Sequence, residues 1–327
     1  MSIKIDLKDR KILHELDLEA NIPTTKLAKN VGLSQQVVDY RIKNMIKNDI
    51  IIGFFTVIDV VQLGYSLYRI HFRFKNVSKE KREEINQFFN KNPFVLWSAY
   101  VGGRWDYIVD FFSKSNKEFS DNLEKIIEKF KDSIQDYEAF NILFLNMYPH
   151  KYLKIANNKK NYKTITIGKE LNNQKLEKVD VDVLNHIKNN SRFPFLQVAE
   201  LLKLDRNTIK YRINKLKQRK IIIGEKLYFR PDKLDLESYK VFFEIDNTDK
   251  ELEKKLFKFF EIEKEIVYSL KMIGKWNVDI EVEVKSRNEL QDLIIKIRNR
   301  FPIIKDYEIM PIFKDTRVDF SPMISIY

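Results

Sequence analysis

The sequence predicts an α+β protein made of two repeats, each a helix-turn-helix domain followed by a ferredoxin-like βαββαβ domain. The repeat itself is the first observation, because the segment from Tyr40 to Gly53 returns from Tyr211 to Gly224 at a constant offset of 171 residues. Within each repeat, apolar residues first recur at helical spacing and then alternate with polar residues, as in half-buried strands. A chain of 327 residues also exceeds what one hydrophobic core usually organises.

The helix-turn-helix domain of the first repeat is expected at residues 1–53. Asp6 can cap a first helix, and Thr24 or Thr25 can cap a short second helix. Gly32 permits the left-handed backbone that a tight turn after the second helix needs. A third helix follows, and its expected cap and apolar face are Ser34, Val37, Val38, Tyr40, Ile42 and Ile46.

The rest of the first repeat changes character and predicts a sheet. A connecting strand is expected at residues 54–61. The strands of the ferredoxin-like domain are then expected at 68–74, 95–101, 107–112 and 140–147, with helices at 79–90 and 119–130. Helices cover only one face of such a sheet, so the other face would expose aromatic side chains. An uncovered apolar face implies a partner surface.

The second repeat predicts the same organisation. Gly274-Lys275-Trp276 falls on Gly103-Arg104-Trp105 at the offset of 171, and a segment rich in Lys and Asn separates the two repeats. The expected domains are 1–53 and 54–153 in the first repeat, a linker at 154–175, 176–224 and 225–320 in the second repeat, and a tail at 321–327.

Composition narrows the class of protein. The net charge of +12 favours partners that carry phosphates. The chain has no cysteine, which excludes disulfides and thiolate zinc sites, and no apolar run approaches the roughly 18 residues of a membrane helix. The four histidines are scattered and no phosphate loop or catalytic triad order is present. We therefore expect a cytoplasmic protein that is no enzyme, with no metal, no cofactor and no membrane partner.

Each repeat resembles the Lrp/AsnC (feast/famine) family over nearly its whole length. The matching pieces are Leu27-Ala28, Val31-Gly32-Leu33-Ser34, Val38, Arg41-Ile42, Ile50 to Gly53, and the turn Gly103-Arg104-Trp105-Asp106. The resemblance implies that the helix-turn-helix domains bind double-stranded operator DNA. It also implies that the sheet domains mediate self-association and, as in many members, hold a small effector such as an amino acid. Two fused units can form an internal pseudo-dimer.

The third helix of each repeat should enter the major groove of DNA, with its first residues nearest the base edges. Gln and Asn pair well with adenine and Arg with guanine. The candidate DNA-binding residues are Ser34, Gln35, Gln36, Tyr40, Arg41, Lys43, Arg206, Asn207, Thr208, Lys210, Tyr211, Arg212 and Lys215.

The two third helices differ in charge. Residues 34–49 hold three cations and two anions, whereas residues 205–220 hold seven cations and one anion. The net charges are thus +1 and +6, and the second repeat is expected to supply more of the salt-dependent affinity for DNA. Because the two helices also differ in sequence, we expect an asymmetric operator.

The turn after the second sheet strand is the candidate effector site. Gly102, Gly103 and Asp106 offer backbone amides that can meet a carboxylate, although a plain hairpin turn explains the same glycines. The second repeat replaces Asp106 by Asn277, which weakens the case for a ligand there, and replaces Gly32 by Lys203, which puts its tight turn in doubt.

Two alternatives are kept beside the regulator. Sirohaem decarboxylases resemble the same architecture, and a tetrapyrrole pocket would have to be lined by residues such as Arg69, His71, Arg73, Arg104 and His150. The other alternative is an assembly or co-regulator protein with reduced DNA contact, which the nearly neutral third helix of the first repeat favours.

Overall fold

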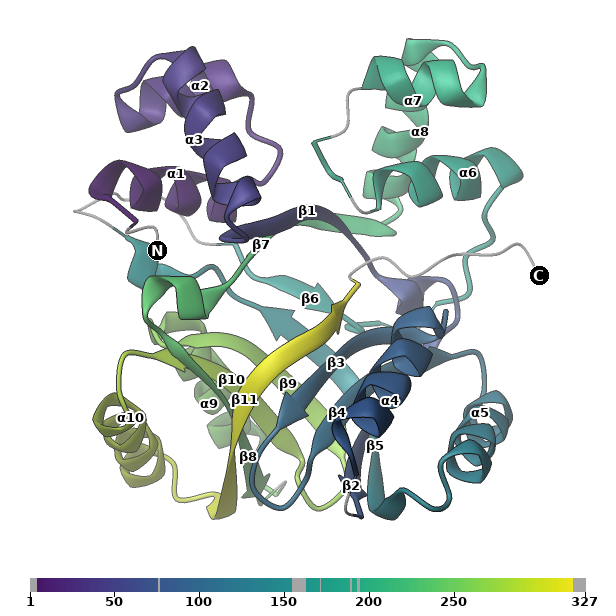
Figure 1. Cartoon of the computed structure of the whole chain (residues 1–327), viewed down its shortest axis with the longest axis vertical. Coiled ribbons are helices and arrows are strands. Elements are labelled where there is room, and N and C mark those ends of the chain that lie inside the picture. Colours follow the sequence, from purple (N-terminus) through teal and green to yellow (C-terminus); the bar gives the residue numbers. More distant parts are fainter. Residues whose placement is uncertain are drawn as a thin grey trace.

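The computed structural model describes residues 5–319 except 76, 155–162, 171, 189, 193–194 and 247. The expected tail at 321–327 and part of the expected linker lie outside the described residues. The three helices before each sheet domain are called head 1 (α1–α3) and head 2 (α6–α8). Figure 1 shows both heads on the same side of a body formed by the strands and the four remaining helices.

The elements of the first repeat follow the expected order. They are α1 (Leu7–Leu18), α2 (Thr24–Val31), α3 (Gln35–Lys47), β1 (Ile51–Ile58), η1 (Val60–Gln62), β2 (Ser66–Phe74), α4 (Lys79–Lys91), β3 (Val95–Val101), β4 (Tyr107–Ser113), α5 (Asn116–Lys129) and β5 (Ile134–Met147). β5 begins six residues before the expected strand, because its first half pairs with β2 as far as Phe74↔Ile134.

The second repeat has the same order after η2 (Lys151–Leu153) and the short strand β6 (Ile165–Ile167). Its elements are α6 (Lys178–Ile187), α7 (Phe195–Leu202), α8 (Arg206–Gln218), β7 (Ile222–Phe229), η3 (Pro231–Leu234), β8 (Glu237–Ile245), α9 (Lys250–Ile262), β9 (Ile266–Ile273), β10 (Val278–Val284), α10 (Arg287–Arg300) and β11 (Ile304–Val318).

The predicted ferredoxin-like domains are confirmed. The strands of the first repeat are ordered β5-β2-β4-β3 and those of the second β11-β8-β10-β9, all antiparallel. The two sheets then join at both edges, where β3 pairs with β11 and β5 pairs with β9. Eight strands thereby close into a ring, and β6 adds a ninth strand to β5.

The apolar faces of the two sheets pack on each other inside this ring. His71, Trp105 and Phe140 of the first repeat and Phe242 and Trp276 of the second are all buried there. The partner surface predicted from the uncovered sheet face is therefore the other repeat of the same chain. The chain is an internal pseudo-dimer.

A buried charge cluster crosses the junction between the repeats. Arg69 of β2 donates to both oxygens of Asp110 at 2.6 and 2.7 Å and also to Asp279 of the other repeat. Lys240 lies 3.4 Å from Asp279 and 3.0 Å from Glu281. Because removal of one partner of a buried ion pair leaves an uncompensated charge, this cluster ties the two sheets together specifically.

A two-stranded ribbon separates the heads from the ring. β1 follows α3, β7 follows α8, and the two strands pair antiparallel from Ile51↔Phe229 to Ile58↔Ile222. Figure 1 shows this ribbon beneath both heads. Each head is thus connected to the body through a strand that is paired with the strand below the other head.

Head 1 is anchored to the body by buried polar residues. The Asp17 carboxylate of α1 accepts from the His150 backbone amide at 2.6 Å, lies 2.7 Å from His150 Nδ1, and accepts from Lys226 Nζ of β7 at 3.3 Å. Burial alone would raise the pKa of Asp17, but Lys226 and His150 outweigh it and hold that pKa well below its usual range. Burial lowers the pKa of His150, so its ring is neutral near pH 7.

Glu283 of β10 lies beside this anchor. The Tyr152 hydroxyl donates to its carboxyl group, and Lys226 and Asp17 also face it. Burial raises the pKa of Glu283 from its ordinary 4.5 to about 8. The folded protein therefore holds a proton that the unfolded chain releases, and stability falls as the pH rises from about 4.5 to about 8.

We expect Glu283→Gln to flatten this dependence. Between pH 6.5 and 8 Glu283 should lower the wild-type free energy of unfolding by up to about 1.4 kcal/mol per pH unit. The opposite contributions of His150, whose ordinary pKa is 6.5, and of Lys151, whose pKa burial lowers to about 8, apply at the two ends of this window to both proteins. Urea unfolding at several pH values measures the slope. Glu128→Gln, on the exposed face of α5, should keep the wild-type slope. An unchanged slope in Glu283→Gln would contradict the assignment.

Candidate nucleic-acid interface

The first helix of each head begins with a capping box. Asp6 and Asp9 form a capping box at the start of α1, and Glu177 and Asp180 form one at the start of α6. Ser34 caps α3, as predicted, by accepting from the Val37 amide at 3.3 Å. The prediction for α2 was wrong: Pro23 occupies its N-cap and no side chain caps it, so Thr24 and Thr25 already lie within the helix.

The turn between the second and third helices has the same left-handed backbone conformation in both heads. Gly32 has φ +65°, and Lys203, at the equivalent position, has φ +53°. The doubt that the substitution raised about the turn of head 2 is thus removed. A lysine in this conformation costs about 1–2 kcal/mol, which the packing of head 2 has to offset.

The buried face of α3 differs from the expected one. Val38, Ile42 and Met45 are buried, whereas Val37, Tyr40 and Ile46 are exposed. The reason is geometric, since positions 38, 42 and 45 form one stripe of the helix and position 40 points away from it. Tyr40 and Tyr211 are 68% and 61% exposed, so neither belongs to the core.

Most candidate DNA-binding residues lie along α3 and α8 with accessible side chains. Exposed ones are Ser34, Gln35, Gln36, Tyr40 and Lys43 in head 1 and Arg206, Asn207, Lys210 and Tyr211 in head 2, with Thr208 half-buried. The arrangement gives each head a polar helix end that an exposed phosphate backbone or base edge can reach.

Two candidates are engaged inside the heads. Arg41 Nη1 contacts Asp6 at 2.7 Å and Asp9 at 2.8 Å. Arg212 Nη1 makes the equivalent contacts, with Glu177 at 2.8 Å and Asp180 at 3.4 Å. Each arginine therefore ties the third helix to the capping box of the first helix through its Nη1 atom. Sequence reasoning missed this because the partners are more than thirty residues away.

Ion pairs also reduce the apparent charge difference between the heads. On α8 and the residues after it, Lys215 pairs with Glu177, Lys217 with Glu225, and Arg219 lies 3.8 Å from Asp180. Within the described residues, the cations of this segment without an acidic partner are Arg206, Lys210 and Lys220. The net charge of +6 therefore overstates what head 2 offers to DNA.

Arg192 connects the two heads. It lies between α6 and α7, and its Nη1 donates to the carbonyls of Ala20 and Ile22 of head 1, both at 3.0 Å. Its guanidinium also lies 5.2 Å from the ring centre of Phe54 in β1. This contact fixes the orientation of head 2 relative to head 1.

The candidate effector turn is already held by the protein. The Gly102 amide donates to Pro311 of β11 at 3.0 Å, and the Asp106 carboxylate accepts from the Phe74 amide at 2.8 Å. Asn277 makes the equivalent bond to the Ile245 amide, also at 2.8 Å. Replacement of Asp106 by Asn277 therefore preserves a structural role. Gly103 and Asp106 do border a cavity of about 560 Å³, which Gly102 does not line.

The five residues considered for a tetrapyrrole do not line one common cavity. His71 is buried among aromatic rings, His150 bonds Asp17, and Arg69 belongs to the charge cluster. Arg73 and Arg104 border the cavity of about 560 Å³. A second cavity, of about 1380 Å³ beside β11, is lined by none of these five residues. In the described residues, no group of three His, Asp or Glu side chains is placed to hold a metal ion.

Comparisons with known protein families match both helix-turn-helix regions of the chain. A model of the AsnC-type helix-turn-helix domain matches residues 5–46, and a model of winged helix-turn-helix DNA-binding domains matches residues 176–223. The proline dehydrogenase transcriptional activator of Rhodobacter capsulatus is 32% identical over 120 residues, which are 36% of this chain and 78% of that protein. Transcriptional regulator AzlB of Bacillus subtilis is 31% identical over 36% of this chain and 76% of its own.

Solved structures of a siroheme decarboxylase resemble nearly the whole chain. The siroheme decarboxylase NirDL has a TM-score of 0.63 over 98% of this chain and 95% of its own, with 15% sequence identity. At that identity the likeness shows a common fold and carries no activity with it. None of the helices in the described residues is both long and apolar enough to cross a membrane.

We expect Arg212→Ala to destabilise the protein more than Lys210→Ala. Arg212 compensates the fully buried Asp180, so its loss should lower the free energy of unfolding by about 1–3 kcal/mol. Lys210 is exposed on the same helix without an acidic partner among the described residues, and its loss should change stability by less than about 0.5 kcal/mol. Urea unfolding distinguishes the two variants. Equal effects would show that Arg212 has no structural role.

Proposed function

The chain belongs to the Lrp/AsnC family of transcription regulators, and on that premise we propose that one chain supplies both DNA-binding heads of a sequence-specific regulator. The observation that carries the proposal is the closed pairing of the two repeats, which places two helix-turn-helix heads on the same side of one body. In proteins with two such heads, each recognition helix reads one half of the binding site.

We propose DNA contacts for those candidate residues whose side chains are accessible to solvent on α3 and α8. Gln35 and Gln36 of head 1 and Asn207 of head 2 can pair with adenine, and Arg206 can pair with guanine. Tyr40, Lys43, Lys210 and Tyr211 are placed to reach phosphates, together with the hydroxyls of Ser34 and Thr208. Arg41, Arg212 and Lys215 support the recognition helices from within the heads.

The two heads should read different sequences. Their recognition helices differ at the exposed positions, and their second helices differ as well. α2 presents Thr25 and Lys29 to solvent, whereas α7 presents Leu196 and Leu201, which are 56% and 60% exposed. Because the helix before the recognition helix crosses the DNA backbone, the exposed Lys29 gives α2 a cationic contact with phosphates, whereas α7 has no cationic residue. An asymmetric operator follows.

We also propose that a small effector binds to the first sheet domain. Gly103, Arg104 and Asp106 border a cavity that is open to solvent, with Arg73 on its wall. An amino acid could place its carboxylate near the two arginines. The compartment proposed for the protein is the cytoplasm, with no membrane partner.

The alternatives have specific tests. Whole-chain likeness to a decarboxylase structure favours a tetrapyrrole enzyme by fold alone. The burial of His71 among aromatic rings and the bonds that engage Arg69 and His150 oppose it. We propose no enzyme activity, and purified protein should show no porphyrin-like absorption band. A co-regulator with reduced DNA contact would bind DNA weakly even at low salt.

We expect Lys43→Ala and Lys210→Ala to weaken DNA binding to a similar extent. Each lysine is exposed and has no acidic partner in the described residues, so each loss should reduce the slope of log affinity against log salt by about 1. Fluorescence anisotropy with labelled genomic fragments across a salt series measures the slopes.

Lys125→Ala, on the exposed face of α5 in the body, is the matched control and should leave the slope unchanged. If neither head variant lowers the slope while the wild type binds, DNA contacts another surface. If the wild type itself binds no DNA at low salt, the proposed function is wrong.

A further inference from the structure

The connection between α6 and α7 of head 2 is bonded to two other parts of the chain. Figure 1 shows its described part on the side of head 2 that faces head 1. The structure describes residues 188 and 190–192 of this connection. Its first residues are bonded to the ribbon strand β1, and Arg192 is bonded to head 1.

The first attachment is to the middle of β1. The buried Thr56 donates its backbone amide to the Lys188 carbonyl at 3.0 Å and its hydroxyl to the Ile187 carbonyl at 2.9 Å. The Ser191 amide donates to the Phe54 carbonyl at 2.8 Å. These three bonds fix the connection along β1, so the residue after Ser191 begins at a defined point.

Arg192 makes the second attachment, to the segment between α1 and α2 of head 1. Its Nη1 atom donates to the carbonyls of Ala20 and Ile22, both at 3.0 Å, and its Nη2 atom donates to the Thr24 hydroxyl at 3.3 Å. Three acceptors around one planar guanidinium define its orientation, because the donors of arginine form a rigid fork. A lysine ammonium has no such plane.

Arg192 also senses the recognition helix of head 1. Burial lowers the pKa of the Arg192 guanidinium, and the carboxylate of Asp39 on α3 opposes that effect. In the first repeat the offset of 171 residues places Asn21 at the position of Arg192, and Asn21 is exposed. The fork of hydrogen bonds from Arg192 is therefore a feature that the second repeat adds to an otherwise repeated fold.

We propose that Arg192 holds the two recognition helices at one separation and thereby restricts the operator to one spacing between its half-sites. This inference rests on the proposed DNA binding, and Arg192 is a positioning residue in it. Each added base pair moves a half-site by about 3.4 Å along the DNA and turns it by about 35° around the axis. Heads that are fixed relative to each other cannot follow such a shift.

The separation of the heads can be measured without DNA. The chain has no cysteine, so Lys29→Cys and Glu200→Cys, at equivalent exposed positions of α2 and α7, carry two spin labels at unique sites. Double electron–electron resonance should give a narrow distance distribution when Arg192 is present. Arg192→Ala should make it about twice as wide, and Arg192→Lys should give an intermediate width because the planar fork is lost.

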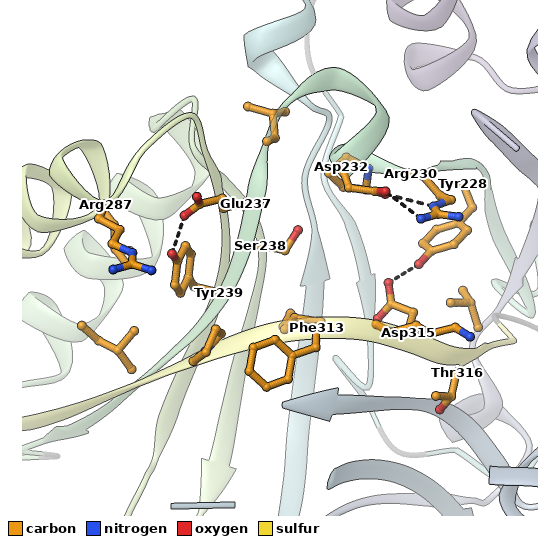
Figure 2. Close-up of a pocket in the computed structure, with 18 of the residues that line it drawn as sticks. Tyr228, Arg230, Asp232, Glu237, Ser238, Tyr239, Arg287, Phe313, Asp315 and Thr316 are labelled. Atoms are coloured by element: carbon orange, nitrogen blue, oxygen red, sulfur yellow. Dashed lines mark hydrogen bonds and ion pairs between the residues drawn. The ribbon is translucent and has the colours of Figure 1, made fainter. Parts of the chain in front are cut away.

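Arg230→Ala is the matched control. Arg230 follows β7 of the same ribbon, and Figure 2 shows its guanidinium paired with Asp232, at 2.9 and 2.6 Å. Its loss should leave the distribution narrow. Equal widths in the labelled parent, Arg192→Ala and Arg230→Ala would overturn the proposal. If Arg192→Ala loses helical circular dichroism, the milder variant Arg192→Lys decides by the same comparison.

DNA of varied spacing tests the consequence for binding. The two half-sites that the wild type selects from random DNA are joined at spacings that change one base pair at a time. The wild type should prefer one spacing over its neighbours, and Arg192→Ala should lose most of that preference while the base preference within each half-site stays the same. Collapse of head 2 would instead weaken recognition of one half-site at every spacing.

The possible failures are distinguishable. A wide label distribution together with an unchanged preference for spacing would overturn the role of Arg192 in DNA binding. If the wild type binds no DNA at all, the proposed function is wrong and the spacing claim is overturned with it. The label distances still show in that case whether Arg192 holds the heads together.

Discussion

Pairing of strand edges between the two repeats is the constraint on which the rest of the structure depends. Each four-stranded sheet leaves one apolar face and two edges without partners. Pairing of β3 with β11 and of β5 with β9 satisfies the edges and encloses both faces at once. Arg69 then bonds Asp110 of its own sheet and Asp279 of the other, so the junction is specific as well as apolar. The position of the two heads follows from this closed body and the β1–β7 ribbon above it.

Because the two units are fused in one chain, their sequences can differ. In a symmetric dimer of two identical chains, every contact made by one chain is also made by the other. In this chain the two repeats make different contacts. Head 1 is anchored by Asp17, His150 and Lys226, and head 2 reaches head 1 through Arg192. The strand β6 adds to the edge of β5, whereas among the described residues β11 pairs with β3 and β8 alone. The recognition helices α3 and α8 differ in sequence for the same reason.

Much of the fold was predictable from the sequence because it depends on local periodicity and on the internal repeat. The positions of the strands, the Ser34 cap and the left-handed turn at Gly32 all follow from residue types at short spacing. The ion pairs of Arg41 and Arg212 were not predictable, since their partners are distant in sequence and a charge count cannot show which cations are neutralised. The strand β6 was missed because three residues are too few to show the alternating pattern of a strand. Their strand conformation depends on pairing with the edge of β5.

Selection of binding sites from random DNA by the purified chain tests the central claim most directly. One chain should bind a site with two different halves at a fixed spacing. Mutation of the exposed residues Gln35 and Gln36 should relax the sequence preference of one half only. A strict palindrome read equally by both halves, or a complex that requires two chains, would contradict that claim.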